Sequence, residues 1–514
     1  MPMPRTDWLD RHALHHPDAP ALVWVPTGDT YTYGELNRMS AQVAAVLVET
    51  YALEPGDRVA VLAPNTVEHV LLFAAAQKAG LVLVPLNSRL GPSELAPVVS
   101  DSAPALICVA STHASAIQNV ETGAHLIPLD DVMQWARAAS SDTPAGAWTA
   151  PAFDDPLMIV YTSGTTGTPK GAVLTHKMLF WNAVNTQMRL DLTTADRSVN
   201  AAPFHHTGGW NVLLTPFLHQ GATTYLLPGF DAGRILNVCD TERLTVLWGV
   251  PTMFRTMAQH ENFTLRALAS VRYAVVGGEA MPEPLIREWH DKGVPIRQGY
   301  GLTEVGVNCF SLPERDSLRK IGSIGFPNFY LDMRVISADG RDVPPGTPGE
   351  LLLRGPVVIP GYWRNPDATA AAIDDDGWFH TGDRVRVDDE GYTYVVGRLT
   401  DMYISGGENV YPAEVEAVLH AHPAVAEAAV VGVPDDTWGE AGAAFVVPAA
   451  ERTLTADAVL SHARDHLAGY KIPKHVRVLD ALPKGPSGKI QKAVLADRVP
   501  TPPETPSPHG VPKT

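Results

Sequence analysis

An apolar run that leads directly into a glycine- and hydroxyl-rich stretch constrains this chain more than any other feature. Residues 157–160 (LMIV) predict a short buried strand, and residues 161–171 (YTSGTTGTPKG) predict that the strand ends and a loop begins. Glycines let backbone N–H groups approach a ligand closely, and successive N–H groups form an anion-binding concavity. Hydroxyl groups and one lysine add donors and a positive charge. The stretch therefore suits a triphosphate, although it lacks the Gly-Lys-Ser/Thr ending of a Walker A loop.

Strand-like and helix-like segments alternate through the first 330 residues or so. Residues 32–35 (TYGE) predict a capping box, and the apolar residues that follow it fall on one helical face. These apolar residues are Leu36, Met39, Val43 and Leu47. Further strands are expected at 58–62, 81–86, 222–227, 244–248 and 271–276, and helices at 67–79, 232–240, 251–259 and 282–291. This repeated βαβ pattern predicts an α/β fold whose large N-terminal domain consists of layered subdomains.

The pattern changes near residue 330. Short strands separated by Asp-Gly and Glu-Gly turns predict a small β unit, with strands at 333–336, 350–353 and 392–396. A second α/β segment then follows, with a helix at 414–420 and strands at 425–433, 443–447 and 476–479. We therefore expect a large domain over 1–398 and a small one over 399–499. A proline-rich tail at 500–514 is expected to be disordered.

Composition and charge narrow the class of partners. The 514 residues are 45% hydrophobic and 18% charged, as in a globular protein of more than one domain. The formal net charge of −17 argues against nucleic acid and against anionic membrane surfaces as partners. An anionic ligand therefore needs a local positive site. The oligomeric state is left open by the sequence, and a homodimer is among the states that it allows.

Cysteine usage and the chain ends bear on location. Cys108, Cys239 and Cys309 are an odd number without paired spacing, which argues against a disulfide framework and against a zinc site. Residues 1–10 lack the form of a signal peptide, and no apolar run reaches the length of a membrane span. The last residues, 510–514, are not a peroxisomal Ser-Lys-Leu address. We therefore expect a cytoplasmic protein.

Several further stretches, in order along the chain, carry a specific resemblance. These are 299–304 (GYGLTE), 377–383 (GWFHTGD), 397–398 (GR), 405–416 (SGGENVYPAEVE) and 486–489 (PSGK). Together with residues 161–171 they resemble the motifs of the adenylate-forming superfamily, which includes acyl-CoA synthetases, peptide-synthetase adenylation domains and luciferases. The matches cover nearly the whole chain. Any one of them would be weak, but their order and spacing make the resemblance specific.

The resemblance implies that two anions, a carboxylate and ATP, are brought together. Catalysis must then neutralise charge and hold the line of attack. Glu304 resembles the family's Mg²⁺-associated glutamate, Thr303 would hydrogen-bond the α-phosphate, and Lys489 would bridge the carboxylate and the α-phosphate. A single glutamate is enough for a cation that also binds phosphates. The residues implied to hold the β- and γ-phosphates are Thr162, Ser163, Gly164, Thr165, Thr166, Gly167 and Lys170.

The resemblance also implies a nucleoside site. Tyr300, followed by Gly301, would stack on the adenine, which Gly278, Glu279 and Ala280 would line. Because ligands bind outside the carboxyl ends of strands in α/β sheets, this position suits residues that follow strands. A carboxylate can accept hydrogen bonds from both ribose hydroxyls. Asp383 is expected to do so, and Arg398 resembles the arginine that also meets the ribose.

The acyl site and the hinge are less sharply marked. Phe204-His205 resembles the family's pair at the acyl pocket, but His206 follows, so which histidine faces the pocket stays open. No aspartate lies within 204–209, which argues against an amino-acid substrate. Apolar candidates for the pocket wall are Trp210, Trp248, Gly249, Val250, Val305 and Val307. In the family a mobile C-terminal domain rotates about a hinge residue that is usually Asp or Lys, and here that residue is Thr400.

The sequence thus predicts an ATP-dependent carboxylate–CoA ligase that uses ATP, Mg²⁺ and CoA. The acid is expected to be a medium- or long-chain fatty acid or an aryl acid. One alternative is an adenylating enzyme that loads the phosphopantetheine of a carrier protein. A second is a regulator that binds acyl groups or nucleotides without turnover, for which Thr400 is the only support. A P-loop ATPase conflicts with the missing Walker A ending.

Overall fold

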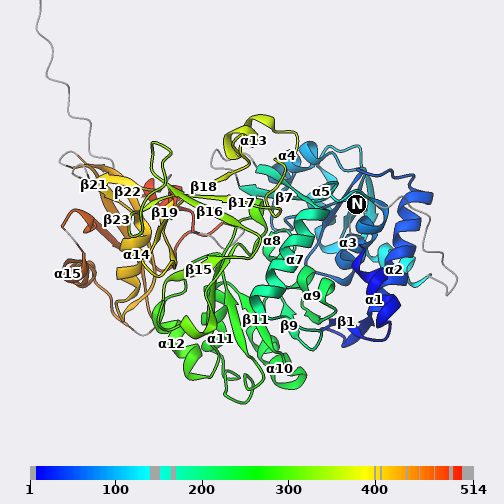
Figure 1. Cartoon of the computed structure of the whole chain (residues 1–514), viewed down its shortest axis with the longest axis horizontal. Coiled ribbons are helices and arrows are strands. Elements are labelled where there is room, and N and C mark those ends of the chain that lie inside the picture. The colour runs from blue at the N-terminus through cyan, green and yellow to red at the C-terminus, as the bar shows by residue number, and fades with distance from the viewer. Residues whose placement is uncertain are drawn as a thin grey trace, which may run out of the picture. The chain divides into compact units, whose positions relative to one another are not determined.

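The computed structural model describes residues 7–138, 151–163, 169–398, 401–405, 408–435, 438–450, 452–467, 469–485 and 490–499. Within these ranges the α/β expectation is confirmed, because strands and helices alternate along most of the chain (Figure 1). Several predicted features lie outside the described residues. They are the loop residues 164–168, Thr400, residues 406–407, the Pro-Ser-Gly-Lys stretch with Lys489, and the tail 500–514.

The first sheet has the strand order β6-β5-β3-β4-β7-β8. Its strands are β3 (Arg58–Leu62), β4 (Val82–Leu86), β5 (Leu106–Val109), β6 (His125–Pro128), β7 (Pro156–Ser163) and β8 (Pro169–Thr175). The nearby helices are α1 (Trp8–His15), α2 (Tyr33–Ala45), η1 (Val46–Thr50), α3 (Val67–Ala79), α4 (Pro92–Ser102), η2 (Ser111–His113), α5 (Ala114–Gln118) and α6 (Leu129–Arg137). The capping box predicted at residues 32–35 is present, and the apolar residues of that helical face are buried. Local sequence signals therefore placed this layer well.

One prediction about this sheet is wrong. The strand expected at 157–160 continues to Ser163 as β7, and residues 169–171 belong to β8. The two strands pair antiparallel, with Thr162 opposite Lys170 and Ser163 opposite Pro169. Cross-strand pairing thus outweighs the turn-like composition at both ends of the stretch. The stretch that was expected to follow the end of a lone strand thus begins and ends in two strands that pair with each other.

A second sheet and a third sheet complete the α/β core. The second has the order β2-β1-β10-β9, with β1 (Pro20–Trp24), β2 (Asp29–Thr32), β9 (Arg197–Asn200) and β10 (Thr223–Leu226). The third has the order β11-β12-β13-β14-β15-β19-β18-β17-β16. Its strands are β11 (Val246–Gly249), β12 (Tyr273–Val276), β13 (Ile296–Tyr300), β14 (Phe310–Ser311), β15 (Ser323–Pro327), β16 (Asp332–Ile336), β17 (Gly349–Arg354), β18 (Phe379–Val387) and β19 (Thr393–Arg398). The accompanying helices are α7 (His176–Leu190), α8 (Thr207–Asn211), α9 (Leu214–Gln220), α10 (Ala232–Glu242), α11 (Pro251–Ala258), α12 (Glu283–Asp291), η3 (Thr303–Val305), η4 (Glu314–Asp316) and α13 (Pro366–Ala372).

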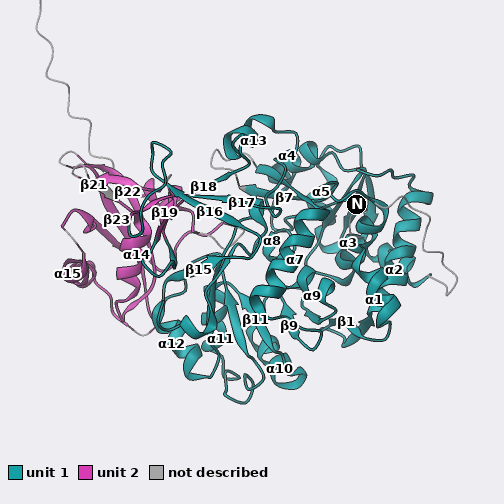
Figure 2. Cartoon of the chain, viewed as in Figure 1, with its two compact units in different colours: residues 1–346, 351–381, 387–394 teal, residues 347–350, 382–386, 395–514 magenta. Residues whose placement is uncertain are grey.

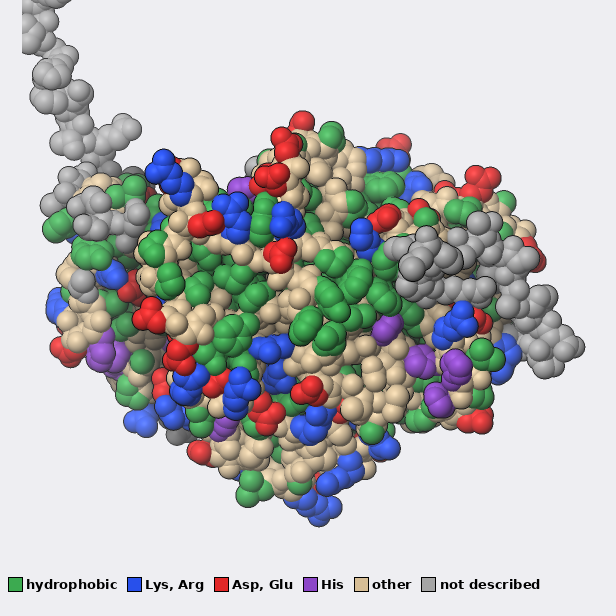
Figure 3. All heavy atoms as spheres, viewed as in Figure 1, with side chains coloured by type: hydrophobic (Ala, Val, Ile, Leu, Met, Phe, Trp, Pro, Cys, Tyr) green, Lys and Arg blue, Asp and Glu red, His purple; other side chains and the backbone are tan. Residues whose placement is uncertain are grey.

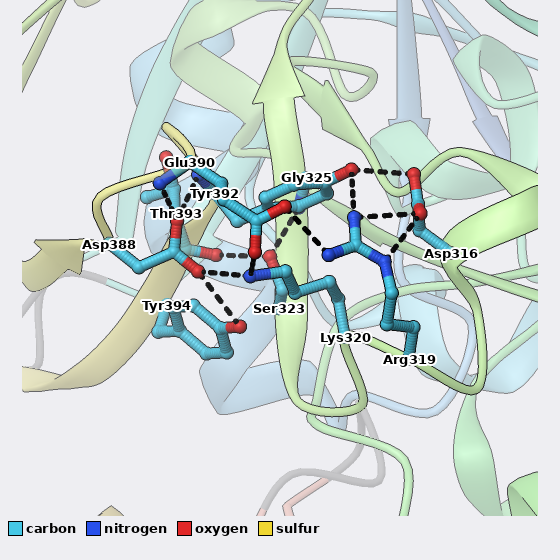
Figure 4. A network of polar contacts seen from close by, with 10 residues as sticks. All are labelled: Asp316, Arg319, Lys320, Ser323, Gly325, Asp388, Glu390, Tyr392, Thr393 and Tyr394. Atoms are coloured by element: carbon cyan, nitrogen blue, oxygen red, sulfur yellow. Dashed lines mark hydrogen bonds and ion pairs between the residues drawn. The ribbon is translucent and has the colours of Figure 1, made fainter.

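A network of ion pairs fastens β15 to β19 (Figure 4). Arg319 lies 2.9 Å from Asp316 and 2.7 Å from Glu390, and Lys320 lies 2.7 Å from Asp388. The basic residues precede β15, and Asp388 and Glu390 lie in the turn before β19. Since each acidic group has a basic partner, the network joins two segments that are distant in sequence and balances their charge.

The chain divides into two compact units (Figure 2). Unit 1 comprises 1–346, 351–381 and 387–394, and unit 2 comprises 347–350, 382–386 and 395–514. Unit 2 contains a five-stranded sheet of order β21-β20-β23-β22, with β24 paired to β23. Its elements are β20 (Tyr403–Ser405), β21 (Glu408–Val410), α14 (Pro412–His420), β22 (Val425–Asp435), β23 (Gly439–Pro448), α15 (Ala456–His466), η5 (Gly469–Lys471), β24 (His475–Val478) and α16 (Lys492–Ala496). The domain boundary expected at residue 398 stays a prediction.

The surface in Figure 3 carries charges of both signs. Lys and Arg side chains are interspersed there with Asp and Glu side chains, and hydrophobic side chains gather over the region of α7. Trp181 of α7 packs edge-to-face on Tyr330, with ring centroids 4.7 Å apart. In the described part of the chain, no helix combines the length and the apolar character that crossing a membrane requires.

Candidate active site

Three neighbouring parallel strands of unit 1 end at one edge of the third sheet. β11, β12 and β13 pair in register, so that Gly249 lies opposite Val276, which in turn lies opposite Gln298. The backbone continues this pairing past the strand end, because the Gly277 N–H donates to Gly249 O at 3.3 Å. Ligands of α/β sheets bind outside such carboxyl ends. The predicted adenine residues either end one of these strands, as Tyr300 ends β13, or follow one, as residues 278–280 follow β12, and therefore share this edge.

A buried amide holds the loop that follows β12. Gln298, 5% exposed, donates from Nε2 to Glu279 O at 3.0 Å and accepts from the Met281 N–H at 3.0 Å. Gly278, with φ +83°, makes the turn that a residue with a side chain would adopt only with strain. Gly278, Glu279 and Ala280 are all exposed. The buried side of the loop is thus held by Gln298, and the residues that are predicted to line the adenine are exposed to solvent.

The segment after β13 turns sharply into η3. Tyr300 ends the strand with its ring edge-to-face on Phe310, the centroids 5.7 Å apart. A Cβ on Gly301 would lie 1.8 Å from the carbonyl oxygen of Val307, so only glycine fits there. Thr303 and Glu304 then form the short 3-10 helix η3, and both are half-buried.

Glu304 is held by neutral groups. Its Oε1 accepts a hydrogen bond from the Tyr362 hydroxyl at 3.0 Å, and its carbonyl oxygen accepts from the Ile359 N–H at 2.9 Å. Among the residues that the structure describes, no three His, Cys, Asp or Glu side chains are grouped to hold a metal ion by themselves. A hard carboxylate standing alone fits Mg²⁺, which proteins commonly bind through one or two carboxylates plus substrate phosphates.

The hairpin of β7 and β8 brings Lys170 to the same neighbourhood. Lys170 Nζ lies 5.4 Å from the ring centroid of Tyr362. The Thr162 hydroxyl donates to Lys170 O at 3.4 Å across the hairpin. Gly171 allows close packing, because a Cβ there would lie 2.7 Å from Ile159 Cγ2. Of the predicted phosphate-binding residues, 164–167 and the side chain of Ser163 lie outside the described part.

The predicted acyl-site histidine is buried in a braced loop. Asn65 accepts from the Phe204 N–H at 2.9 Å and donates to Ala202 O at 2.8 Å. His205 is 8% exposed, and burial, reinforced by His206, lowers its pKa to about 3. The ring is therefore neutral at physiological pH, and its Nε2 has no hydrogen-bond partner within the described residues. His206 is half-buried, with its ring centroid 4.4 Å from that of His205.

The six wall candidates separate by exposure. Trp210, Gly249 and Val305 are buried, whereas Trp248, Val250 and Val307 are half-buried. Trp248 and Val307 pack on an otherwise buried cluster that includes Val212, Val246 and Val275. The Trp248 ring also lies on Gly208, where a Cβ would come within 2.8 Å of Cη2. Of the six, Trp248, Val250 and Val307 are thus the ones with surface left for a ligand.

In unit 2, Asp383 and Arg398 lie together. Arg398 Nε donates to Asp383 Oδ1 at 3.1 Å. Asp383 is 4% exposed and lies inside β18, and the preceding Gly382 has φ +68°. The carboxylate is therefore paired with an arginine within a strand and is not a turn residue. Its ribose role, like every site role taken from the resemblance, stays a prediction.

Two lysines that lie near Lys489 in the sequence form ion pairs. Lys484 lies 2.8 Å from Glu427, and Lys492 lies 2.8 Å from Glu416, all in unit 2. Both lysines therefore have local ion-pair partners, as surface lysines often do.

Sequence reasoning did not single out Tyr362, Gln298 or Asn65. Each acts through hydrogen bonds to residues distant in the chain, such as Glu304, which is 58 positions from Tyr362. No local pattern marks such partners. The only sequence signal was the presence of a polar group beside glycine or proline, and this is too common to be informative.

Comparisons with known proteins identify relatives along nearly the whole chain. A family described as AMP-binding enzyme matches residues 9–363, and one described as AMP-binding enzyme C-terminal domain matches residues 414–489. Feruloyl-CoA synthase of an Amycolatopsis species is 41% identical over 96% of this chain and 98% of its own length. The long-chain-fatty-acid–CoA ligase FadD13 of Mycobacterium tuberculosis is 36% identical over 96% and 99%, respectively. The structure of o-succinylbenzoate coenzyme A synthetase from Bacillus subtilis, in complex with ATP and magnesium ion, matches with a TM-score of 0.84 and 31% identity over 96% of this chain and 98% of that one.

Proposed function

Because this chain belongs to the AMP-binding enzyme family, we propose that it is an AMP-forming acid–thiol ligase that joins a carboxylic acid to coenzyme A. The resemblance seen in the sequence is thereby confirmed. In the first step a carboxylate oxygen attacks the α-phosphorus of ATP. The bond between the α-phosphorus and the oxygen that bridges to the β-phosphorus breaks, and pyrophosphate leaves. In the second step the CoA thiol attacks the acyl carbon of the adenylate, and AMP leaves.

The observation that carries the proposal is the grouping in unit 1 around Tyr362. The tyrosine contacts Glu304 through its hydroxyl and Lys170 through its ring. A cation-binding carboxylate and a phosphate-binding ammonium are what a metal–nucleotide complex requires. When bound, Mg²⁺ would draw charge from the phosphate oxygens, and Glu304 is the described residue that would hold it.

The remaining roles in adenylation follow the family pattern. Thr303 would orient the α-phosphate. The residues that would bind the β- and γ-phosphates are Thr162, Ser163, Gly164, Thr165, Thr166, Gly167 and Lys170. Asp383 and Arg398 would bind the ribose, and Lys489 would neutralise the charge that develops between carboxylate and phosphate. His205, neutral because it is buried, would line the path of the carboxylate without adding a charge.

The second step requires a different face of the C-terminal domain. We propose a domain boundary at residue 398 and a rotation about Thr400 that withdraws Lys489 and presents residues 406–409. A threonine at this position departs from the usual Asp or Lys. The departure bears on thioester formation and not on adenylation. We also propose that the enzyme works in the cytoplasm, since all three cysteines are buried and free.

For the acid, we favour an aryl acid over a long alkyl chain. The Trp248 indole is half-buried and lies against Gly208, so it offers a flat aromatic wall. Aromatic rings pack well on such a surface, with a gain of about 0.5–1.5 kcal/mol beyond area burial. The relatives' names include both an aryl-acid and a fatty-acid ligase, and Trp248 is the feature of this chain that favours the first.

A panel of acids tests the proposal. Purified protein is given ATP, Mg²⁺ and CoA with benzoate-, cinnamate- and fatty acids of increasing length, and AMP and acyl-CoA are read by mass spectrometry. We expect a thioester with aryl acids, and Trp248→Leu should reduce the cinnamate-to-octanoate ratio of kcat/KM about 5-fold. AMP without thioester would favour a carrier protein as acceptor. No AMP with any acid would favour the regulator.

A further inference from the structure

One tyrosine in unit 1 lies between two groups of opposite charge. The Tyr362 hydroxyl donates to Glu304 Oε1 at 3.0 Å, and Lys170 Nζ lies over the ring at 5.4 Å from its centroid. A lysine at this distance from an aromatic face makes a cation–π contact. The ammonium and the carboxylate are thus both drawn to Tyr362. Within the described residues, neither Glu304 nor Lys170 forms a salt bridge.

The backbone around Tyr362 is fastened at both sides. The Trp363 N–H donates to Gly171 O at 2.7 Å, which ties the segment to β8. The Ile359 N–H donates to Glu304 O at 2.9 Å, which ties it to η3. The Tyr362 N–H itself donates to the Thr369 hydroxyl at 2.9 Å. The backbone that carries the phenol is therefore held by hydrogen bonds to β8, to η3 and to Thr369.

We propose that Tyr362 is a positioning residue that keeps Glu304 and Lys170 apart and holds each ready for a metal–nucleotide complex. The inference rests on the proposed function of Glu304 as the Mg²⁺-binding carboxylate. A direct Lys170–Glu304 ion pair would neutralise both groups before ATP arrives. The phenol prevents this, because it donates to the carboxylate without cancelling its charge, and its ring contacts the ammonium without taking its proton.

The protonation state of Tyr362 suits this role. The pKa of a tyrosine hydroxyl is ordinarily about 10, well above physiological pH. The hydroxyl therefore keeps its proton throughout the physiological range and remains a donor. One oxygen of Glu304 is occupied by this bond, and the other oxygen is left for the cation.

The test compares the binding of ATP with and without its metal by calorimetry on the full chain in the absence of acid. Tyr362→Phe removes only the hydroxyl and keeps the ring. We expect MgATP to bind about 10-fold more weakly, as for a lost hydrogen bond to a charged group, and ATP in EDTA to bind within about 2-fold of the wild type. Tyr362→Leu removes the ring as well, so that Lys170 can pair with Glu304. Both MgATP and metal-free ATP should then bind more weakly.

A second tyrosine–glutamate pair in unit 1 provides the matched control. The Tyr225 hydroxyl donates to Glu242 Oε2 at 3.0 Å, the same length as the Tyr362 bond. Tyr225 lies in β10 and Glu242 in α10. Tyr225→Phe removes an equivalent hydrogen bond at a different place, and we expect both nucleotide affinities to stay unchanged. Melting temperatures of all variants show whether any of them loses the fold.

Glu304→Gln separates this inference from the proposed function. If Glu304→Gln weakens MgATP but Tyr362→Phe does not, the role of Tyr362 is overturned and the proposed function survives. If Glu304→Gln leaves MgATP binding unchanged, both fail. Equal weakening of MgATP and metal-free ATP by Tyr362→Phe would indicate general damage and would also overturn the inference. In a variant that carries both Glu304→Gln and Tyr362→Phe, MgATP should bind as weakly as to Glu304→Gln alone, because the tyrosine acts through Glu304.

Discussion

Two regions of unit 1 differ in the partners that they give to carboxylates. Beside β15 and β19, Asp316 and Asp388 each have a basic partner, Arg319 or Lys320 (Figure 4). At η3, Glu304 has a tyrosine donor, and no residue in the described ranges forms a salt bridge with it. A carboxylate that already has a cationic partner stabilises the fold. A carboxylate that has only a neutral donor keeps its charge for a ligand.

The tyrosine is not what distinguishes the two regions. The Tyr392 hydroxyl donates to Asp316 at 2.5 Å, just as Tyr362 donates to Glu304. The hydrogen bond from Tyr392, followed by that from Arg319, lowers the pKa of Asp316. The presence of the arginine is therefore the difference. It follows that substitutions in the two regions should give opposite signatures, one in binding and catalysis and the other in stability.

The largest effect is expected at Glu304. Glu304→Gln keeps the shape of the side chain and removes its charge, so pyrophosphate release driven by the acid should fall about 100-fold, equivalent to about 2.7 kcal/mol. The melting temperature should stay within about 2 °C of the wild type, because no ion pair is lost. Steady-state kinetics at saturating ATP and differential scanning fluorimetry measure the two quantities. If Glu304→Gln lost stability but kept its kinetic constants, Glu304 would stabilise the fold as Asp316 and Asp388 do, and the proposed difference between the two regions would be wrong.

A smaller effect is expected at Lys170. Lys170→Gln removes a positive charge that the hairpin offers to phosphate, so the KM for ATP should rise about 10-fold, while the KM for the acid is unchanged. Initial rates at varied ATP and varied acid measure this. Lys177→Gln is the control, because Lys177 pairs with the exposed Asp154 at 3.1 Å and lies outside the candidate site. If Lys170→Gln and Lys177→Gln had the same KM for ATP, Lys170 would not belong to the nucleotide site.

Asp316 should show the reverse signature. Asp316→Asn deprives Arg319 of one of its two acidic partners, leaving Glu390, and weakens the bond from Tyr392, so the melting temperature should fall by about 2–4 °C. Kinetic constants at 25 °C should stay within about 2-fold of the wild type. Fluorimetry and the acid-dependent assay measure both. A large loss of MgATP binding here would mean that the network, and not Tyr362, sets the position of the site.

The smallest effect is the pH dependence of the stability that Asp316→Asn loses. Since the pKa of Asp316 is lowered in the folded state, its charge stabilises the fold above the unfolded pKa of about 4, and the gain disappears as pH falls through the folded value. The gap in unfolding free energy between the wild type and Asp316→Asn should therefore be constant from about pH 7 to pH 5 and should narrow below about pH 4. Urea unfolding at each pH measures it. A gap that stays constant at low pH would argue against stabilisation by the charge.

Local signals in the sequence were enough for most single elements. The helix expected at 67–79 and the strand expected at 58–62 agree with α3 and β3 at both ends, because apolar runs and the turn residues that flank them are signals that act over a few positions. The hairpin of β7 and β8 was missed at its inner ends. Its glycines and hydroxyl residues are typical of loops, and only pairing across the hairpin makes residues 161–163 and 169–171 strands.

The sequence by itself determined the family, the α/β class and the order of the candidate site residues, because each is written in short stretches that do not depend on distant partners. Only the tertiary structure decided which groups meet. Tyr362 contacts Glu304 and Lys170 because the segment around it is bonded to both η3 and β8, and no pattern within any of the three segments encodes that meeting. The state of each carboxylate is likewise decided by the tertiary structure. Whether it is neutralised or left for a ligand depends on which residues the fold brings beside it.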